Sequence, residues 1–516
     1  MPERPTEQST YPLVLAIDVG TSSVRALLFD RRGTALDFPA AQKAYDLATT
    51  PDGGATVDAE MLFDLTVMVI DQALSAAGED AQHIAAVGIS CFWHSLLGLD
   101  GDAHPVTPVY LWADKRSARE VEELRATFDQ RDIHQRTGCV IHSSYWPAKL
   151  RWLRAEAPEQ FEAASRWCAF SDYLLRRVSG ADLTSISMAS GTGMLDVRNG
   201  FWDLGVADMT GIDPETLPRI ADAGETVKSL LPEYAERWPA LASVPWLPSL
   251  GDGACANVGA GGVGDDRIAL SLGTSGAMRI VIGRKLGAPV IIPEGLWAYR
   301  LDHGRIVLGA AISNGGKVLA WMNDLLESKF DGEEMTRAAE LQPDSHGLTI
   351  LPFLAGERSP IWNDRATAVI AGLKLSTGRV ELLRAGMESV GLRFARLYHL
   401  LKPVAAKRHE IVAGGAAILN SPAWLQITAD CLRHPLTAPP PTEESSARGA
   451  AIMALLATGV ISDLREASDP ADGATVIHPS AEAANVYAHA LQRQNALESL
   501  LFPNGSSWDH QFVVDD

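Results

Sequence analysis

Hydrophobic runs interrupted by short polar turns recur along this chain, and two of these patterns are built alike. Residues 13–17 are apolar, residues 18–23 form a polar turn, and residues 24–29 resume the apolar pattern. Buried strands have such a pattern, so a β-hairpin is predicted here. Residues 268–282 repeat the same order of strand, Gly-Thr-Ser turn and strand.

The two predicted hairpins align. Their turns share a Gly-Thr-Ser sequence, which covers Gly20, Thr21 and Ser22 in the first and Gly273, Thr274 and Ser275 in the second. Asp18 stands where the second hairpin has Ser271. This repeat predicts two related domains, residues 1–248 and 249–516, that face each other across a cleft. The pattern is similar to that of the actin/hexokinase/Hsp70 superfamily, so we expect an α/β fold with two ribonuclease H-like domains.

The first turn has the chemistry of a phosphate site. Gly20 lets backbone approach a ligand closely, and the three residues after it offer hydroxyl and amide donors. Asp18 supplies a carboxylate suited to a hydrated Mg²⁺. The turn lacks the lysine that a P-loop would need. The alternative is an ordinary polar hairpin turn.

Further candidates follow predicted strands, where ligands bind in open α/β folds. Residues 84–90 are predicted as a strand that leads to Trp93 and His94. A second strand is predicted to deliver Asp114 and Arg116. His94 is as well explained by a structural histidine, and the other two could form a salt bridge that ends the strand.

Two glycine-rich stretches add candidates in the second half of the chain. Asp252 lies between two glycines, directly before a predicted helix of small residues. An acid there is well placed at a cleft, and we expect the glycines to let substrate approach; the alternative is a helix N-cap. A Gly-Gly turn, Gly414 and Gly415 followed by Ala416, comes after a predicted strand and could lie against a nucleoside or be structural.

Composition narrows the function. The net charge of −20 argues against a nucleic-acid or anionic-membrane partner. The chain has five scattered cysteines, which favour reduced, mostly buried thiols in a cytoplasmic protein. No run of 18 apolar residues occurs, so no membrane span is predicted. The polar N-terminus does not resemble a secretion signal.

With these residues assembled, the chain resembles the FGGY family of carbohydrate kinases over nearly its whole length. Residues 368–388 match the family's C-terminal signature, with Gly386 as a departure. The other signature, around Lys149, has Trp146 where Pro, Ser or Thr is usual. Within the family the chain is most similar to the gluconate kinases, although Trp93 replaces their usual Met before the histidine.

The resemblance implies ATP-dependent phosphorylation of a primary hydroxyl, with Mg²⁺ as a cofactor. It implies that Asp252 is the general base and that Asp18 holds Mg²⁺, through water. The predicted nucleotide contacts are Thr21, Ser22 and Arg25 at the γ-phosphate, Gly273, Thr274 and Ser275 at the other phosphates, and Gly414, Gly415 and Ala416 at the adenosine. Gly20 belongs to the first of these groups as the turn glycine.

The expected substrate is a small sugar or sugar acid, and gluconate, giving 6-phosphogluconate, is favoured. The predicted sugar contacts are Trp93, His94, Asp114 and Arg116. Glu357 and Arg358 are predicted as a structural ion pair. The alternatives are a xylulose or other polyol kinase, an ATPase of the same fold, and a catalytically silent sugar sensor. A homodimer is common in this family.

Overall fold

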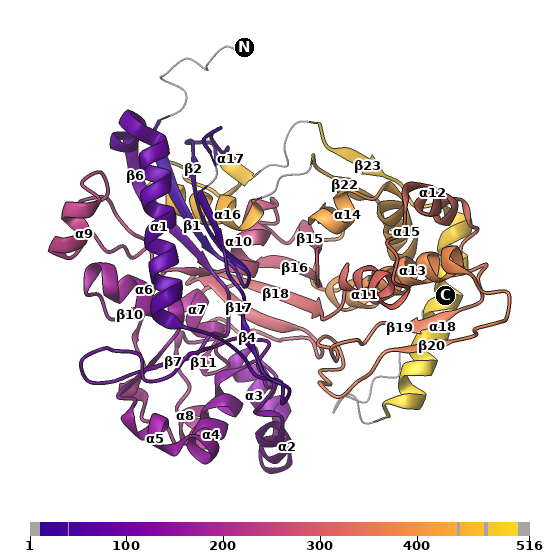
Figure 1. The fold of residues 1–516 in the computed structure, drawn as a ribbon, viewed down its shortest axis with the longest axis horizontal. Coiled ribbons are helices and arrows are strands. Elements are labelled where there is room, and N and C mark those ends of the chain that lie inside the picture. The colour runs from indigo at the N-terminus through magenta and orange to yellow at the C-terminus, as the bar shows by residue number, and fades with distance from the viewer. Residues whose placement is uncertain (1–10, 40, 441–443, 469–472, 504–516) are drawn as a thin grey trace.

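We describe a computed structural model of the chain, which covers residues 11–39, 41–440, 444–468 and 473–503 (Figure 1). The prediction for the polar N-terminus concerns residues that lie largely outside these ranges. Figure 1 shows two sheets, one from the N-terminal part of the chain and one from the C-terminal part, with helices around them.

The first sheet contains the predicted first hairpin. Its strand order is β14-β6-β1-β2-β3, with bounds Leu250–Gly251, Ile84–Cys91, Leu13–Val19, Ser23–Phe29 and Ala41–Ala44. Strand β1 is antiparallel to β2 and parallel to β6. The register places Asp18 opposite Arg25. The hairpin prediction is therefore confirmed.

The second sheet contains the second hairpin. Its strand order is β17-β18-β16-β15-β21-β22-β23, with bounds Trp297–Asp302, Arg305–Ile312, Gly276–Gly283, Arg267–Leu272, Glu410–Gly414, Leu436–Ala438 and Thr475–Ile477. Strand β15 is antiparallel to β16 and parallel to β21. The order β21-β15-β16-β18 thus repeats the order β6-β1-β2-β3, with matching strand directions. The predicted internal repeat is confirmed, as is the two-domain α/β fold.

Helix α1 (Ala59–Ala77) covers the first sheet and begins where the sequence predicts. The Asp58 carboxylate accepts a hydrogen bond from the Met61 amide at 2.8 Å, as N-caps do. The helical stretch Ala59–His83 is long and apolar enough to cross a membrane by length and composition. Many of its apolar side chains, including Leu62 and Ile70, are buried in the core, although Met61 and Met68 are exposed. This stretch therefore has the character of a core helix.

Helices α10 (Asp252–Gly259) and α16 (Ser445–Ala457) pack against each other beside the first sheet. A Cβ atom on Gly449 would lie 1.8 Å from the Cys255 carbonyl oxygen, so the two backbones are in direct contact. In Figure 1 the yellow α16 lies among the indigo strands. Two elements from after the predicted boundary at residue 248, β14 and α16, therefore pack with the first sheet, and the division stays a prediction.

The remaining elements complete the two halves. Before residue 250 they are β4 (Ala48–Thr49), β5 (Ala55–Val57), η2 (Gly78–His83), β7 (Leu97–Leu99), β8 (Val109–Tyr110), α2 (Ala118–Thr127), α3 (Gln130–Thr137), α4 (Trp146–Glu156), α5 (Pro158–Ala163), β9 (Arg166–Cys168), α6 (Phe170–Ser179), β10 (Leu183–Ser185), α7 (Ile186–Ser190), β11 (Leu195–Asp196), β12 (Phe201–Trp202), α8 (Leu204–Thr210), η3 (Pro214–Thr216), β13 (Arg219–Ala221) and α9 (Pro232–Arg237). After it they are α11 (Lys317–Leu325), α12 (Gly332–Glu340), β19 (Thr349–Leu351), β20 (Val369–Ala371), α13 (Arg379–Leu401), α14 (Ala416–Leu419), α15 (Pro422–Leu432), α17 (Arg465–Ser468) and α18 (Ala481–Leu501).

One local prediction is wrong in part. The small-residue run at residues 184–193 reads as loop and strand, but helix α7 occupies its middle. Ser185 explains the difference, because its hydroxyl accepts from the Met188 amide at 3.0 Å and starts the helix. The five cysteines are free and buried, as predicted.

Candidate active site

A cavity of about 440 Å³ lies where the two hairpins and the end of β6 meet. Its polar lining comes from both halves of the chain and consists of Thr21, Ser22, His94, Ser144, Asp252, Ser271, Thr274, Ser275, Ser313, Lys317, Arg279 and Arg358. Its aromatic lining consists of Trp93, Trp112, Tyr145, Trp297, Tyr299 and Trp362. We call this the sugar cavity, after the sugar contacts that the family resemblance predicts here. Polar groups converging on an aromatic-walled cleft are typical of small-molecule sites.

A second cavity, of about 720 Å³, adjoins the first. Gly414 and Gly415 line it, together with Glu444, Ser445 and Arg448 near the start of α16. Ser271 and Arg279 line both cavities, so the two cavities adjoin at these residues. We call this the nucleotide cavity. Its size and glycine-lined wall fit an adenosine, and the sugar cavity lies next to it.

Asp252 lies in the sugar cavity at the start of α10. Gly251 is the N-cap, so the helix-cap alternative for Asp252 does not hold. The Asp252 carboxylate accepts a hydrogen bond from the Gly253 amide at 2.7 Å. Burial raises its pKa, while the charge of Arg279 lowers it. A carboxylate with a raised pKa in a cleft is a candidate proton acceptor.

Asp18 lies at the end of β1, near Asp252. It is 9% exposed, and its Oδ1 has no hydrogen-bond partner among the described residues. Burial, with a smaller contribution from the charge of Asp252, raises its pKa to about 6. A buried, unpaired carboxylate oxygen beside a second carboxylate fits a hydrated divalent cation, because Mg²⁺ prefers oxygen ligands and retains several waters.

Each Gly-Thr-Ser turn is closed by a hydrogen bond from its glycine amide, to the third residue after Gly20 in the first turn and to the second residue after Gly273 in the second. The Gly20 amide donates to the Ser23 carbonyl at 2.9 Å, and the Gly273 amide donates to the Ser275 carbonyl at 3.0 Å. Both glycine amides are thus used inside the turns. The hydroxyls of the Thr and Ser residues after each glycine line the sugar cavity and remain as the turns' side-chain donors to a ligand.

Arg25 lies outside the lining of both cavities. Its Nη1 forms an ion pair with Glu444 at 2.5 Å. The cations that line the sugar cavity are Arg279, Lys317 and Arg358, which the sequence reasoning missed. Arg279 could have been predicted from the alternation of side chains along a strand. It pairs with Ala269 on the neighbouring strand and therefore lies on the same face as Ser271, two residues further along.

The predicted ion pair between Glu357 and Arg358 is wrong at the side chains. The Glu357 carboxylate accepts from the Ser313 amide at 2.8 Å and lies 3.7 Å from the Arg393 guanidinium. The Arg358 guanidinium instead lies over the Trp112 ring, 5.1 Å from its centroid. Arg358 is therefore available to the cavity.

Trp93 explains the glycines that flank Asp252. A Cβ atom on Gly251 would lie 1.8 Å from the Trp93 indole, and one on Gly253 would lie 2.5 Å from it. The indole Nε1 also donates to the Ser187 carbonyl at 3.0 Å. The expectation that these glycines let substrate approach needs correction, because the indole fills the space beside them.

His94 lies in the sugar cavity in a strained backbone conformation, with φ of 69°. Such conformations persist where the surroundings enforce them and cluster at functional sites. Its Nδ1 lies 2.5 Å from the Gly191 carbonyl oxygen and therefore carries the proton. Burial lowers its pKa to about 3, so the ring is neutral at neutral pH. The Nε2 atom remains as an acceptor for a hydroxyl group.

Asp114 and Arg116 lie outside the lining of the sugar cavity. They form an ion pair at 2.5 Å, and the Asp114 carboxylate also accepts from the Ala55 amide at 2.9 Å. Arg116 lies 4.5 Å from the centroid of the Trp152 ring. These contacts favour the salt-bridge alternative over a sugar contact.

The Gly-Gly turn has the geometry of a tight backbone approach. Gly415 has φ of 92°, and a Cβ atom there would lie 2.5 Å from the Leu272 carbonyl oxygen, so glycine is needed for structure alone. Gly414 and Gly415 both line the nucleotide cavity, whereas Ala416, the first residue of α14, is outside its lining. The turn thus serves the fold and the cavity together.

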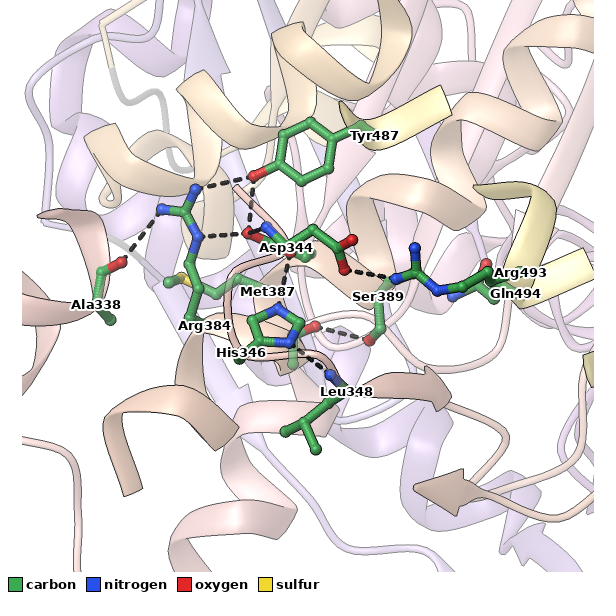
Figure 2. Close-up of polar contacts among 12 residues, drawn as sticks. Ala338, Asp344, His346, Leu348, Arg384, Met387, Ser389, Tyr487, Arg493 and Gln494 are labelled. Carbon is green, nitrogen blue, oxygen red and sulfur yellow. Dashed lines mark hydrogen bonds and ion pairs between the residues drawn. The ribbon is translucent and has the colours of Figure 1, made fainter. Parts of the chain in front are cut away.

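Figure 2 shows a second polar region, around Asp344 and His346. With Glu388 these residues form a cluster in which one oxygen or nitrogen atom of each lies within 4.8 Å of the others. The Leu348 amide donates to His346 Nδ1 at 2.9 Å, so the ring proton is on Nε2 and points to Glu388, 2.9 Å away. Nε2 is therefore not free to ligate a metal. The cluster instead links the loop at residues 344–348 to α13 and α18.

Two family models match the chain. The model for the FGGY family of carbohydrate kinases, N-terminal domain, matches residues 13–259, and the model for the C-terminal domain of that family matches residues 268–458. The gluconokinase of Bacillus subtilis (strain 168) is 28% identical over 469 residues, which cover 88% of this chain and 90% of that protein. The xylulose kinase of Escherichia coli (strain K12) is 29% identical over 450 residues, which cover 86% and 90%.

A solved structure agrees with these matches. The crystal structure of gluconate kinase from Lactobacillus acidophilus superimposes with a TM-score of 0.86 at 26% identity and covers 96% of this chain and 99% of that chain. The family models together span most of the chain and include both hairpins and Asp252. The chain therefore belongs to the FGGY family of carbohydrate kinases and has the two-domain fold of the actin/hexokinase/Hsp70 superfamily.

Proposed function

We propose that this kinase transfers a phosphoryl group from ATP to the primary hydroxyl of gluconate and forms 6-phosphogluconate. The observation that carries the proposal is the position of Asp252 in the sugar cavity, which adjoins the nucleotide cavity at Ser271 and Arg279. A hydroxyl held at Asp252 would face a nucleotide entering from the adjoining cavity. Phosphoryl transfer depends mainly on such positioning and on charge neutralisation.

Each group of residues has a proposed role. Asp252 accepts the proton of the attacking hydroxyl, since its raised pKa strengthens it as a base. Asp18 holds Mg²⁺ through water, and the bound cation would neutralise phosphate charge. The hydroxyls of the two Gly-Thr-Ser turns hold the phosphates. Gly414 and Gly415 accommodate the adenosine.

The sugar contacts are proposed from the cavity lining. His94 Nε2 accepts from a substrate hydroxyl, and Trp93 with the neighbouring aromatic rings covers the carbon chain. We retain Arg25 as a phosphate contact only for a nucleotide-bound state in which its ion pair with Glu444 has opened. Asp114 and Arg116 support the wall of the cavity through their mutual ion pair.

Support for gluconate comes from the first relative above and from the excess of cations over acids in the cavity lining, where Asp252 faces Arg279, Lys317 and Arg358. A xylulose kinase is the second candidate, because the E. coli xylulose kinase is as similar in sequence. An ATPase or a silent sensor is less well supported, since both carboxylates and both turns are intact. We also propose a cytoplasmic location, with which five free buried thiols agree.

The test is ADP release with Mg-ATP against gluconate, xylulose, ribulose, glycerol, erythritol and no sugar, with the product identified by NMR. We expect turnover with gluconate and a phosphate on its terminal carbon. Turnover on xylulose instead would keep the kinase and change the substrate. Sugar-independent ATP hydrolysis would contradict the proposal and favour an ATPase.

A further inference from the structure

Two arginines in the sugar cavity lack an anionic partner. Arg279 projects from β16, and Arg358 follows Glu357 in the segment between β19 and β20; both line the cavity. Within the described ranges, neither forms an ion pair with a carboxylate. The Nε atom of each is buried without a hydrogen-bond partner.

The contacts that the two guanidiniums do make are weak and neutral. Arg279 Nη1 donates to the Ser271 hydroxyl at 3.3 Å, and Arg358 Nη2 donates to the Ile312 carbonyl at 3.4 Å. These distances lie beyond the usual range for good N–H···O bonds. Most of the hydrogen-bonding capacity of both side chains is therefore unused.

The acids nearby neutralise them only in part, because the charge of Asp252 raises the pKa of both arginines without forming an ion pair with either. Glu357 is engaged by the Ser313 amide and by Arg393. Burial lowers the pKa of Arg279 to about 10, and the charge of Arg358 contributes to this lowering. The two cations thus lie close enough to repel each other. Unpaired buried charges are unfavourable, so an anion that binds between the two guanidiniums would be stabilised strongly.

The position of Arg358 indicates which anion this is. Phosphate groups would lie at the Gly-Thr-Ser turns, whose hydroxyls line the sugar cavity as Arg358 does, whereas Arg358 does not line the nucleotide cavity. It lies over the Trp112 ring, within the aromatic wall along which a carbon chain would extend. A guanidinium fork matches a carboxylate in a bidentate pair.

We propose that Arg279 and Arg358 together bind the carboxylate of a polyhydroxy acid, so that the enzyme selects sugar acids over neutral polyols. This inference rests on the proposed function, because it assumes that the sugar cavity holds the phosphate acceptor. It adds to the proposed function that the enzyme recognises the carboxylate of the substrate, and that Arg279 and Arg358 bind it.

The test compares gluconate with glucitol, which differs from it by a CH₂OH group in place of the carboxylate. Wild-type kcat/KM should favour gluconate by about 100-fold or more, since hydrogen bonds to charged groups are strong. In Arg358→Gln and Arg279→Gln this preference should fall by about 10- to 100-fold, mainly through the KM for gluconate. The KM for ATP should change little in Arg358→Gln, because Arg358 does not line the nucleotide cavity. Both variants should lose less activity on glucitol than on gluconate.

Two further variants keep the test interpretable. Arg358→Lys and Arg279→Lys keep the charge without the fork, so each should retain part of the preference. Arg365→Gln is the matched control, because Arg365 belongs to the same segment, is 73% exposed and pairs with Glu122. It should leave the preference unchanged. Thermal unfolding and ATP binding establish that each variant is folded, and the lysine variants replace any glutamine variant that is not.

Each outcome decides a different point. Equal losses on gluconate and glucitol would overturn the carboxylate assignment, leave the kinase reaction standing and assign the arginines to the phosphoryl group. Binding is measured separately, by quenching of tryptophan fluorescence with gluconate, xylonate and their alditols. Arginine-dependent binding of an aldonate without gluconate turnover would support the carboxylate site and contradict the proposed substrate. No binding of any aldonate would overturn the inference.

Discussion

The two hairpins, β1–β2 and β15–β16, have the same backbone design and opposite charge chemistry. Both place a Gly-Thr-Ser turn at the cleft, and both closing glycine amides bond within the turn. The first has Asp18 near Asp252, whereas the second has Ser271 at the corresponding position and Arg279 on the same face as Ser271. A duplicated frame thus supplies a carboxylate from one side and a guanidinium from the other.

This difference shows that the shared turn sequence determines where each hairpin lies at the cleft, while the neighbouring strand residues determine which charge it supplies. Asp18 and Arg25 are cross-strand neighbours in the first hairpin, yet Glu444 holds Arg25 outside the cavities. In the second hairpin Arg279 has no such partner and faces the cavity. Each prediction below changes one hairpin, or a nearby glycine, against its counterpart.

The largest effect on activity is expected from the hairpin acids. Asp18→Asn should lower kcat by about 10³-fold, because metal sites that neutralise transferring phosphates contribute several kcal/mol. Ser271→Ala, at the corresponding position, should lower it by about 10-fold or less, through the loss of one neutral hydrogen bond to Arg279. Steady-state ADP release measures both. Equal losses would contradict the division of roles between the hairpins.

In the metal-free protein, the ionised carboxylate of Asp18 should lower the free energy of unfolding. The pKa of Asp18 is raised to about 6 by burial, so the protonated form favours folding and this contribution is lost as the pH rises through 6. Asp18→Asn should therefore increase the free energy of unfolding by about 1 to 3 kcal/mol at pH 7 and by almost nothing at pH 4. Denaturant unfolding in EDTA checks this. A variant less stable than wild type at pH 7 would contradict the pKa direction.

Substitution by alanine should affect protein stability differently at two glycines near the site. Gly251→Ala would bring a Cβ atom within 1.8 Å of the Trp93 indole and should destabilise the protein by about 1 to 3 kcal/mol. Gly273→Ala meets nothing within 4 Å and should leave stability within about 0.5 kcal/mol. Thermal unfolding compares them. Matching losses of stability would show that Trp93 does not occupy the space beside Gly251.

The smallest effect is expected for alanine substitutions of the turn glycines, Gly20 and Gly273. These variants test whether a ligand approaches the backbone there, because the added methyl group does not disturb the packing. A Cβ atom on Gly20 would be in ordinary contact, 3.4 Å from the Ser23 carbonyl oxygen, and one on Gly273 would be in open space. If the turns hold phosphates, Gly20→Ala and Gly273→Ala should each raise the KM for ATP by about 3- to 10-fold at unchanged stability. An unchanged KM for ATP would count against phosphate binding at that turn.

Much of the fold could be predicted from the sequence, because the spacing of apolar residues indicates its strands and helices. The two hairpins, α1 with its Asp58 cap and the paired sheets follow from apolar runs and turn residues. Asp252 could be placed at a cleft because glycines flank it. The reason for the glycines could not be found, since the Trp93 contact joins segments about 160 residues apart.

Side-chain partners were the hardest part to predict. Arg25 lies two residues after the first turn, and its partner Glu444 is 419 residues away. Glu357 and Arg358 are adjacent in sequence, yet long-range contacts separate their side chains. Local spacing indicates which residues are near one another along an element, but tertiary contacts decide which charges face the cavity.

The account's central claim is that Asp252 accepts the proton of the sugar hydroxyl, and one measurement tests it most directly. The rate of gluconate-dependent ADP release is compared in wild type and Asp252→Asn, with ATP and gluconate affinities measured on the same samples. The account predicts a loss of kcat of about 10²- to 10⁴-fold with both affinities retained. A variant that binds both substrates and keeps wild-type turnover would contradict it.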